Sequence, residues 1–391
     1  MVTSILLSAL RNPAVIKSFS ASDWNLLLRQ ASSAKMLARL AYNFTKLDLT
    51  CHIPEKILHH INSEQVKVAH LHQQVRQEVQ ELDELFRKLK IKTIYLKGTA
   101  YLLADLPLAQ GRYFSDIDIL LNKDEISRIE IALKCKGWKS QKTDDQDQAY
   151  YRNYMHEIPP MQHILRGTII DIHHNILPVC NDNKIDISLL SAGALIIAEK
   201  NILDNPTNYD PSYVLAPEAM FLHSAIHLFH EGELEQGLRG LSDLDILFSH
   251  FESNDQSFSQ KLIKLAQQIN QQQSLFFAWR YLDKVFNRAL PEEARVFVAQ
   301  YQMQTVRLLT ADFTFTHLFN AHHSTTVTWR FTLAAQLAYW RGHLLRMPLR
   351  LLIPHLCRKS WLQLIEFTKK EPAKINKADA LDPRFHQLDE D

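Results

Sequence analysis

A short stretch around residues 95–121 constrains the fold more than any other part of the chain. A brief apolar run ends at Lys97, Gly98 breaks it, and a helical pattern follows, so a strand, a tight turn and a helix come in quick succession. A second apolar run then opens with two carboxylates, Asp116 and Asp118, separated by one residue. Because the side chains of a strand alternate between its faces, both carboxylates lie on one face.

This pair of carboxylates predicts a divalent metal site. Two carboxylates on one face repel each other and pack poorly into a core. A divalent cation removes that conflict, and oxygen ligands of this kind suit Mg²⁺. The alternative is a solvent-facing strand whose carboxylates only favour solubility. The upstream turn at Gly98 and the cation Arg112 favour the metal interpretation.

The turn at Gly98 predicts a phosphate contact. A glycine turn before a helix lets backbone N–H groups approach a phosphate. A phosphate cradle beside metal carboxylates is the minimal apparatus for moving a nucleotidyl group. Lys97 and Arg112 would neutralise phosphate charge in such a site. A plain salt bridge at the surface is a nearly equal alternative for these two cations.

Asp171 is the next carboxylate that can join the pair, since it stands late in the apolar run 168–173. If this strand lies beside the first, Asp171 points at the same metal site and would orient and deprotonate an attacking hydroxyl. The alternative is a strand-end aspartate that caps a turn. His173 and His174 follow, and one of them shares or flanks the face of Asp171, which suggests a substrate contact.

The chain as a whole predicts an α+β fold in which a mixed sheet with helices is flanked by N-terminal helices and a C-terminal helical domain. A helix capped by Asn62 extends to residue 89. Short strands are expected at 92–96, 117–121, 150–154, 161–165 and 168–173, the last two joined by a turn at Arg166-Gly167. We expect four parts: an N-terminal helical segment (1–90), a catalytic core (91–202), a C-terminal helical domain (203–370) and a mobile tail (371–391).

The bulk composition narrows the class of protein. Lys and Arg number 44 against 43 Asp and Glu, so no global basic field favours binding to a long nucleic acid. The four cysteines are scattered without a CxxC pair, which disfavours a disulfide framework or zinc knuckle. No secretion signal and no apolar run long enough for a transmembrane helix are found. A cytoplasmic location is therefore expected.

Three further features have structural alternatives to a functional role. Residues 242–247 nearly repeat the acidic strand, but their apolar residues recur at helical steps. Arg239 and Asp243 would then pair on this helix, or Arg239 would reach a nucleotide. His223, His227 and His230 suit packing in a cleft better than a zinc site. The basic stretch 340–353 suits an ordinary packed helix better than a membrane surface.

Four motifs stand in a fixed order: Leu96-Lys97-Gly98, Arg112, Ser115-Asp116-Ile117-Asp118-Ile119-Leu120, and Ile170-Asp171-Ile172-His173. In this order they resemble the uncharacterised nucleotidyltransferase family of the DNA polymerase beta-like superfamily, over roughly residues 60–250. The resemblance implies two Mg²⁺ ions on the carboxylate pair and a third acid that activates the acceptor hydroxyl. The implied metal ligands and catalytic residues are Asp116, Asp118 and Asp171, and the implied nucleotide contacts are Lys97, Gly98, Thr99, Arg112 and Ser115.

The expected function is therefore Mg²⁺-dependent transfer of a nucleoside monophosphate from an NTP, ATP among the candidates, to a hydroxyl. The acceptor would be a small molecule or a protein side chain, since the neutral charge balance disfavours an RNA end. One alternative is a non-catalytic binding or regulatory protein with this fold. Another is a toxin or antiphage transferase with the same chemistry and a different target. The sequence discloses neither the donor base, nor the acceptor, nor the oligomeric state, nor the pathway.

Overall fold

The computed structural model describes residues 4–114, 116–142, 144–181, 183–196, 212–346, 350 and 352–353. The chain divides into two compact units, Met1–Arg346 and Met347–Asp391. The fold and the site below belong to the first unit. Ser115, one of the predicted nucleotide contacts, and the predicted tail 371–391 lie outside the described residues. The finer division at residues 90 and 202 stays a prediction.

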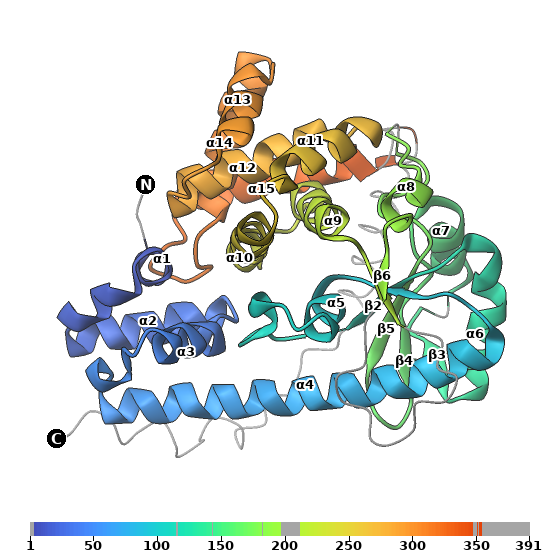
Figure 1. The fold of residues 1–391 in the computed structure, drawn as a ribbon, viewed down its shortest axis with the longest axis horizontal. Coiled ribbons are helices and arrows are strands. Elements are labelled where there is room, and N and C mark those ends of the chain that lie inside the picture. Colours follow the sequence, from blue (N-terminus) through green and yellow to red (C-terminus); the bar gives the residue numbers. More distant parts are fainter. Residues whose placement is uncertain are drawn as a thin grey trace, which may run out of the picture. The chain divides into compact units, whose positions relative to one another are not determined.

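A mixed sheet of seven strands forms the centre of the unit, with the order β3-β4-β5-β2-β1-β7-β6 (Figure 1). The acidic strand β2 lies in its middle, antiparallel to β1 and parallel to β5. This mixed sheet among many helices confirms the predicted α+β class. The strands are β1 (Ile94–Tyr95), β2 (Ile117–Leu120), β3 (Trp138–Ser140), β4 (Met161–His163), β5 (Ile169–His173), β6 (Leu195–Ile196) and β7 (Tyr213–Val214).

Helices precede the sheet, connect its strands and follow it (Figure 1). They are α1 (Ile5–Arg11), α2 (Ala21–Ser33), α3 (Leu37–Lys46), α4 (Glu55–Leu89), α5 (Lys97–Leu103), α6 (Ile126–Cys135), α7 (Asp145–Tyr154), α8 (Ile187–Ser191), α9 (Pro217–His230), α10 (Gly237–Asn254), α11 (Phe258–Gln268), α12 (Gln272–Phe286), α13 (Glu292–Gln300), α14 (Thr305–Leu318) and α15 (Trp329–Arg346). Short 3-10 helices are η1 (Pro13–Ser18), η2 (Thr50–His52), η3 (Pro107–Ala109) and η4 (Lys123–Glu125).

The long helix α4 begins earlier than its sequence suggests. It starts at Glu55, directly after Pro54, and Asn62 lies inside it rather than at its cap. The buried Ile61 continues the apolar stripe upstream of Asn62, so packing extends the helix beyond the local capping signal. Its length, about 50 Å at the usual rise per residue, carries it from α2 and α3 to the sheet (Figure 1).

The predicted strand at 150–154 is wrong, because these residues form the end of α7. The Asp144 side chain accepts a hydrogen bond from the Gln146 N–H and caps this helix. The aromatic run resembles a strand, but the cap and the acidic first turn favour a helix. The predicted hairpin turn is confirmed, with Gly167 in a left-handed conformation (φ 72°) between β4 and β5.

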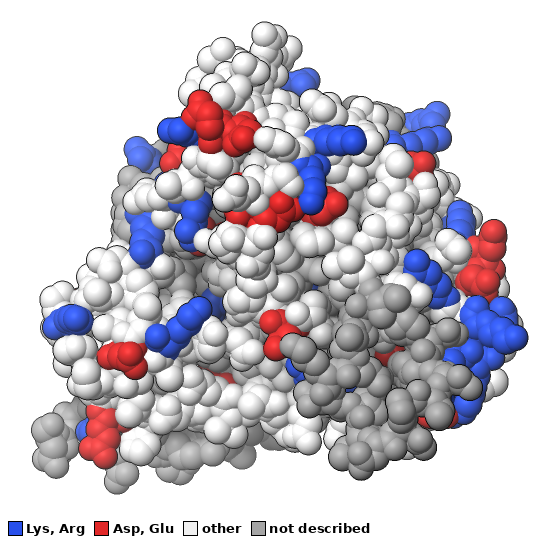
Figure 2. Space-filling view, viewed as in Figure 1, with Lys and Arg blue, Asp and Glu red and all other residues white. Residues whose placement is uncertain are grey.

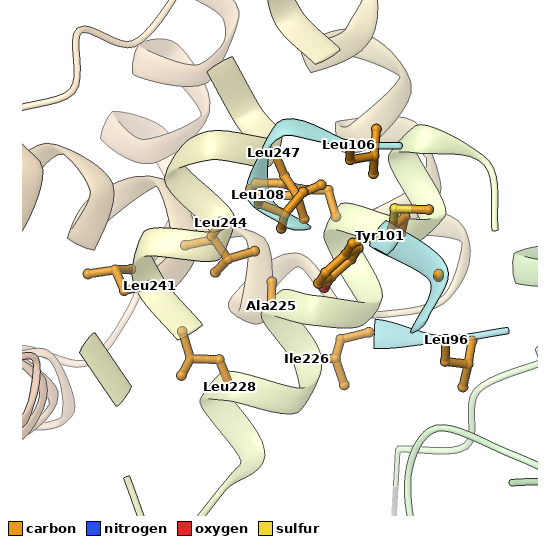
Figure 3. Packing of buried hydrophobic residues seen from close by; sticks show 14 of the residues in the cluster. Leu96, Tyr101, Leu106, Leu108, Ala225, Ile226, Leu228, Leu241, Leu244 and Leu247 are labelled. Atoms are coloured by element: carbon orange, nitrogen blue, oxygen red, sulfur yellow. The ribbon is translucent and has the colours of Figure 1, made fainter. Parts of the chain in front are cut away.

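Residues 213–214 form β7, and from Pro217, which opens α9 in its first turn, the described residues form helices and their connections as predicted. Residues 242–247 belong to α10, which confirms that they are a helix and no second acidic strand. Tyr101, Leu106 and Leu108 pack against side chains of α9 and α10, among them Ala225, Leu244 and Leu247 (Figure 3). This contact holds α5 and η3 against the helical part of the unit.

The start of the basic stretch 340–353 is the end of α15. The Arg341 guanidinium donates to the Phe229 carbonyl (2.5 Å) and lies over the Phe277 and Phe315 rings. Burial lowers the pKa of Arg341 to about 10. These contacts fit the packed helix, while residues 347–349 and 351 lie outside the described part. Among the described residues, no helix combines the length and apolar character needed to cross a membrane.

Candidate active site

Three carboxylates converge at the centre of the sheet. In the parallel pairing of β2 with β5, Asp118 lies directly beside Asp171. Oxygen atoms of Asp116, Asp118 and Asp171 all lie within 4.8 Å of one another. The period of two in each strand places them on one face, as the sequence predicted. Their catalytic and metal-binding roles stay a prediction, but their arrangement is that of a divalent metal site.

The Asp171 carboxylate supports this interpretation. Its Oδ1 atom is buried without a hydrogen-bond partner in the described structure. Burial, then the negative charges of Asp118 and Glu157, raise the pKa of Asp171 to about 7. A buried carboxylate without a donor is costly unless a cation or proton satisfies it. The oxygen ligands present thus fit a hard divalent cation.

Lys97 provides one positive charge at this cluster. Its Nζ atom lies 2.6 Å from Asp118 Oδ1, so the cation pairs with a candidate metal ligand in this structure. Burial opposes the charge of Lys97, but the carboxylates of Asp118 and Asp116 outweigh it and raise its pKa. The backbone of Lys97 is left-handed, with a φ of 48°. Non-glycine residues pay of order 1–3 kcal/mol for such strained conformations, which often occur at functional sites.

His173 is the second donor to Asp118. Its Nε2 atom lies 3.0 Å from Asp118 Oδ1 and 3.4 Å from Glu157 Oε2. Burial alone would raise the pKa of Asp118, but Lys97 and then His173 outweigh it and lower the pKa strongly. The predicted substrate contact of His173 or His174 stays a prediction. Glu157 was missed, because only the long-range pairing of Glu157 with His173 brings it here.

Gly98 allows a close contact with two side chains. A Cβ atom at this position would lie 2.4 Å from Phe114 Cδ1 and 2.5 Å from Arg112 Nη1. The left-handed residue of the turn is therefore Lys97, and Gly98 is needed for space. Thr99 is fully buried, and its hydroxyl has no hydrogen-bond partner among the described residues. Arg112 thus stands directly against the predicted phosphate turn.

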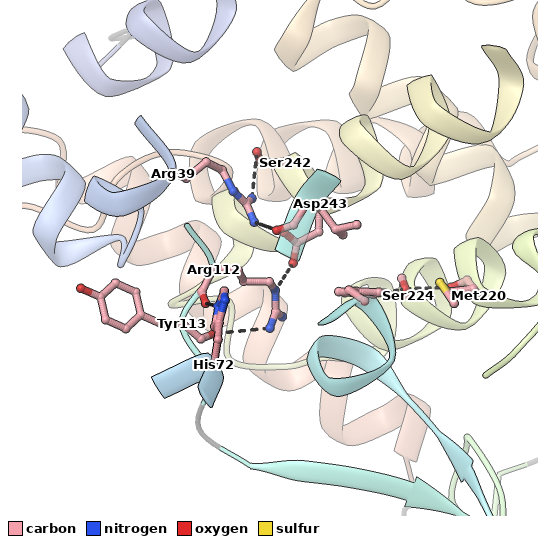
Figure 4. A network of polar contacts seen from close by, with 10 residues as sticks. Arg39, His72, Arg112, Tyr113, Met220, Ser224, Ser242 and Asp243 are labelled. Atoms are coloured by element: carbon pink, nitrogen blue, oxygen red, sulfur yellow. Dashed lines mark hydrogen bonds and ion pairs between the residues drawn. The ribbon is translucent and has the colours of Figure 1, made fainter. Parts of the chain in front are cut away.

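A buried ion-pair network fixes Arg112 (Figure 4). Asp243 of α10 pairs with Arg112 Nε at 2.9 Å and with Arg39 of α3 at 2.6 Å. Arg39 also donates to Ser242. The expected pair between Arg239 and Asp243 is therefore replaced by two longer-range pairs among the described residues. A lone arginine in the apolar run 37–41 was the only sequence signal for Arg39.

A cavity of about 330 Å³ lies next to Lys97, the residue that pairs with Asp118. Lys97 and Arg112 line it together with Arg239, whose pKa burial lowers to about 10. Tyr101 and Ser224 form part of its wall and are hydrogen-bonded to each other. The lining also contains acidic side chains, those of Glu231, Glu233, Glu235 and Asp243. The three cations are the groups there that suit an anionic ligand such as a polyphosphate.

The three histidines of α9 have no described role in metal binding. Neither of the two clusters of potential metal ligands in the described residues includes His223, His227 or His230. Burial lowers the pKa of His223 to about 3, so it is neutral at physiological pH. His230 Nδ1 lies 2.9 Å from the Ile226 carbonyl oxygen of its own helix. These observations favour packing over a zinc site.

A mixed α+β sheet with three converging carboxylates beside a strand–turn–helix defines a nucleotidyltransferase-like protein. Comparison with known families agrees with this class. The family described as uncharacterised nucleotidyltransferase matches residues 20–287, more than half of the chain. The protein belongs to this family. No curated protein matches the chain. Membership supports nucleotidyl transfer in general and leaves the donor and acceptor open.

Proposed function

We propose that the protein is a Mg²⁺-dependent nucleotidyltransferase that moves a nucleoside monophosphate from an NTP to a hydroxyl acceptor, either a small molecule or a protein. The convergence of Asp116, Asp118 and Asp171 within 4.8 Å carries the proposal. Lys97, Arg112 and the cavity beside them support an NTP as the donor. The charges of this unit also fit a small donor, since Lys and Arg lie among Asp and Glu on the described part of the face in Figure 2.

Asp116, Asp118 and Asp171 would hold the metal, as the resemblance implies for two ions. Bound Mg²⁺ supplies a lower pKa at the attacking hydroxyl and charge stabilisation at the phosphates. Asp171 accepts the proton of the acceptor hydroxyl, and the oxygen of that hydroxyl forms a bond to the α-phosphorus. The bond from the α-phosphorus to the leaving oxygen breaks, and pyrophosphate departs.

Cations of the cavity would bind the donor. Arg112, held by Asp243, and Arg239 would contact the phosphates of the NTP. Lys97 would balance the charge of Asp118 until metal and nucleotide enter. Gly98 and Thr99 would contribute backbone N–H groups, and Ser115 would contact the nucleotide as the resemblance implies. These residues would bind the NTP donor, and the acceptor would be identified by screening hydroxyl compounds and proteins.

Calorimetry with each of the four NTPs, with and without Mg²⁺, tests the proposal. We expect Mg²⁺-dependent binding of at least one NTP, and its loss in a double Asp116→Ala/Asp118→Ala variant. Asp124→Ala is the matched control, because this aspartate is exposed and follows the same strand closely. Turnover with an acceptor should fall by on the order of 10³-fold in the double variant. Binding of no NTP by the folded wild type would overturn the proposal and favour the non-catalytic alternative.

A further inference from the structure

A second cluster of possible metal ligands lies next to the three carboxylates. It consists of His156, Glu157 and His173, whose ligand atoms all lie within 4.8 Å of one another. Glu157 Oε2 is 3.4 Å from His173 Nε2 and 4.0 Å from His156 Nε2. A tetrahedral ion with bonds of about 2.0–2.1 Å separates its ligand atoms by about 3.4 Å. The separation of Glu157 Oε2 from His173 Nε2 equals this value, and the 4.0 Å separation from His156 Nε2 is longer and would have to shorten.

The backbone holds the three residues in place. Glu157 and His173 face each other in an antiparallel bridge. The N–H of Ile158 donates to the Ile172 carbonyl, and the N–H of His174 donates to the His156 carbonyl. The two imidazole rings are 5.3 Å apart at their centroids and tilted by 33°. Small side-chain rotations on this fixed frame suffice to close a ligand set.

The described contacts of the His156 imidazole are with the other two members of the cluster, Glu157 and His173. This imidazole forms no hydrogen bond among the described residues, and its Nδ1 atom is buried without a partner. Its side chain is 17% exposed and that of Glu157 is 18% exposed, while His173 is 3% exposed. The cluster is therefore enclosed on the side of His173 and reachable from solvent on the other. A bound ion would keep an open position for water.

The chemistry of this cluster differs from that of its neighbour. The three aspartates offer only oxygen, which suits Mg²⁺. Two imidazole nitrogens and one carboxylate suit zinc and related transition metals. The carboxylate of Asp118, whose Oδ1 atom lies 3.0 Å from His173 Nε2, adds negative charge beside this cluster.

We propose that His156, Glu157 and His173 bind a transition-metal ion of the zinc class, at a site separate from the three aspartates. His173 links the two sites, because its Nε2 atom contacts Asp118 in the metal-free protein and would face the ion in the bound one. The ion would thus withdraw one hydrogen bond from Asp118 and add positive charge close to the aspartates. Zinc binding should in consequence weaken Mg²⁺ binding there. The proposal does not depend on nucleotidyl transfer.

Zinc titration of the tag-free, chelator-treated full chain tests the site, with a chromophoric chelator as competitor. We expect one Zn²⁺ per chain, and an affinity about 100-fold lower in His156→Ala and in Glu157→Gln. Neither residue contacts the aspartates through a described hydrogen bond, and near-UV circular dichroism reports whether each variant is folded. His60→Ala is the matched control, because this histidine is exposed on α4. Asp171→Asn should keep the zinc affinity.

Two outcomes would overturn the proposal. If the folded wild type binds zinc no more tightly than the His156→Ala and Glu157→Gln variants, the cluster is only a polar contact in which His173 Nε2 lies between Asp118 and Glu157. If Asp171→Asn abolishes zinc binding together with Mg²⁺ binding, the ion sits on the aspartates. Loss of NTP binding with zinc binding retained would instead count against the transferase function and leave this site standing.

Discussion

At the scale of single residues, the partners of each buried carboxylate decide which protonation state it favours. Asp118 and Asp171 are neighbours across two strands, yet their environments differ. Lys97 and His173 donate to Asp118 and lower its pKa, whereas Asp171 has a buried oxygen without a partner and a pKa near 7. One carboxylate is thus ionised at neutral pH, and the other is poised to accept or release a proton.

The raised pKa of Asp171 predicts a pH dependence of stability. The folded state keeps a proton on Asp171 up to about pH 7, while the unfolded chain releases it near pH 4. Stability therefore falls as pH rises through this window, by up to about 4 kcal/mol without metal. Asp171→Asn should remove the fall, which urea unfolding between pH 5 and pH 8 would measure.

The buried His223 has the opposite effect on stability, because its pKa is lowered in the folded protein. The free energy of unfolding falls as pH drops below the pKa that His223 has in the unfolded chain. Because wild type and Asp171→Asn share His223, their difference isolates Asp171. Mg²⁺ should raise the melting temperature of the wild type more at pH 8 than at pH 6. Parallel pH profiles of the two proteins would show that Asp171 is not held neutral.

Gly98→Ala is expected to disrupt the turn without touching a carboxylate. The added methyl group would overlap Phe114 and Arg112, and overpacking of this kind costs about 1–3 kcal/mol. Displacement of Arg112 should also weaken NTP binding in calorimetry. Gly193→Ala is the control, because its methyl group would approach only the Ala216 Cβ, at 3.3 Å. Equal stability of the two variants would contradict the close contact at Gly98.

Individual site residues differ in how far the sequence predicts them. The strand period was enough to bring Asp116, Asp118 and Asp171 together, because a period of two fixes the face once the strands pair. Glu157 follows a helix and precedes two prolines, and no local pattern connects it to His173. Arg39 and Asp243 are 204 residues apart, so their buried pair was beyond any local argument.

At the scale of secondary-structure elements, α10 shows how two similar aspartates acquire different roles. Asp243 and Asp245 are separated by one residue, so on a helix they point in different directions. Asp243 is buried between Arg39 and Arg112, whereas Asp245 pairs with the partly exposed Arg288. The acidic string of β2 places its two aspartates on one face, and the nearly identical string of α10 does not.

This difference predicts unequal costs of removing the two charges. Asp243→Asn leaves Arg39 and Arg112 buried without a counter-charge, which should cost about 3–5 kcal/mol. Asp245→Asn should cost less than about 1 kcal/mol, because Arg288 keeps contact with water. Urea unfolding of both variants gives the comparison directly. A cost of Asp243→Asn similar to that of Asp245→Asn would contradict the buried network.

The type of a secondary-structure element was predictable where a single sequence signal dominated. The apolar period of α10 and the turn before β5 gave correct elements, whereas α7 and the start of α4 did not follow from local patterns. In α7 an aromatic run resembled a strand, and a side-chain cap decided for a helix. In α4 tertiary packing extended the helix past a plausible cap. Where local signals for two structures are of similar strength, tertiary contacts decide which structure forms, and the sequence alone does not show these contacts.

At the scale of the whole molecule, side-chain contacts cross the divisions that the sequence predicts. Gln30 donates to Thr325, and Arg39 pairs with Asp243, so the N-terminal helices contact the C-terminal helices directly. Tyr101 of α5 contacts Ser224 of α9 across the other division. Burial of charged and aromatic groups at these contacts favours cooperative unfolding of the described residues of this unit.

Three buried tryptophans report on this cooperativity, one in each predicted part: Trp24, Trp138 and Trp279. With 5-fluorotryptophan incorporated and the signals assigned by single Trp→Phe variants, fluorine NMR follows each part during urea unfolding. We expect the three native signals to disappear at the same urea concentration. Loss of one signal well before the others would show instead that the predicted domains unfold separately.

The direct pairing of Asp118 with Asp171 has a genetic consequence. Many base changes in the codons of β5 would exchange one apolar side chain for another and leave the aspartate in place. Loss or gain of a single codon just before Asp171 would turn Asp171 and His173 together to the opposite face of the sheet. Among natural descendants of this gene, the number of residues in β5 should therefore vary less than the identity of its apolar residues.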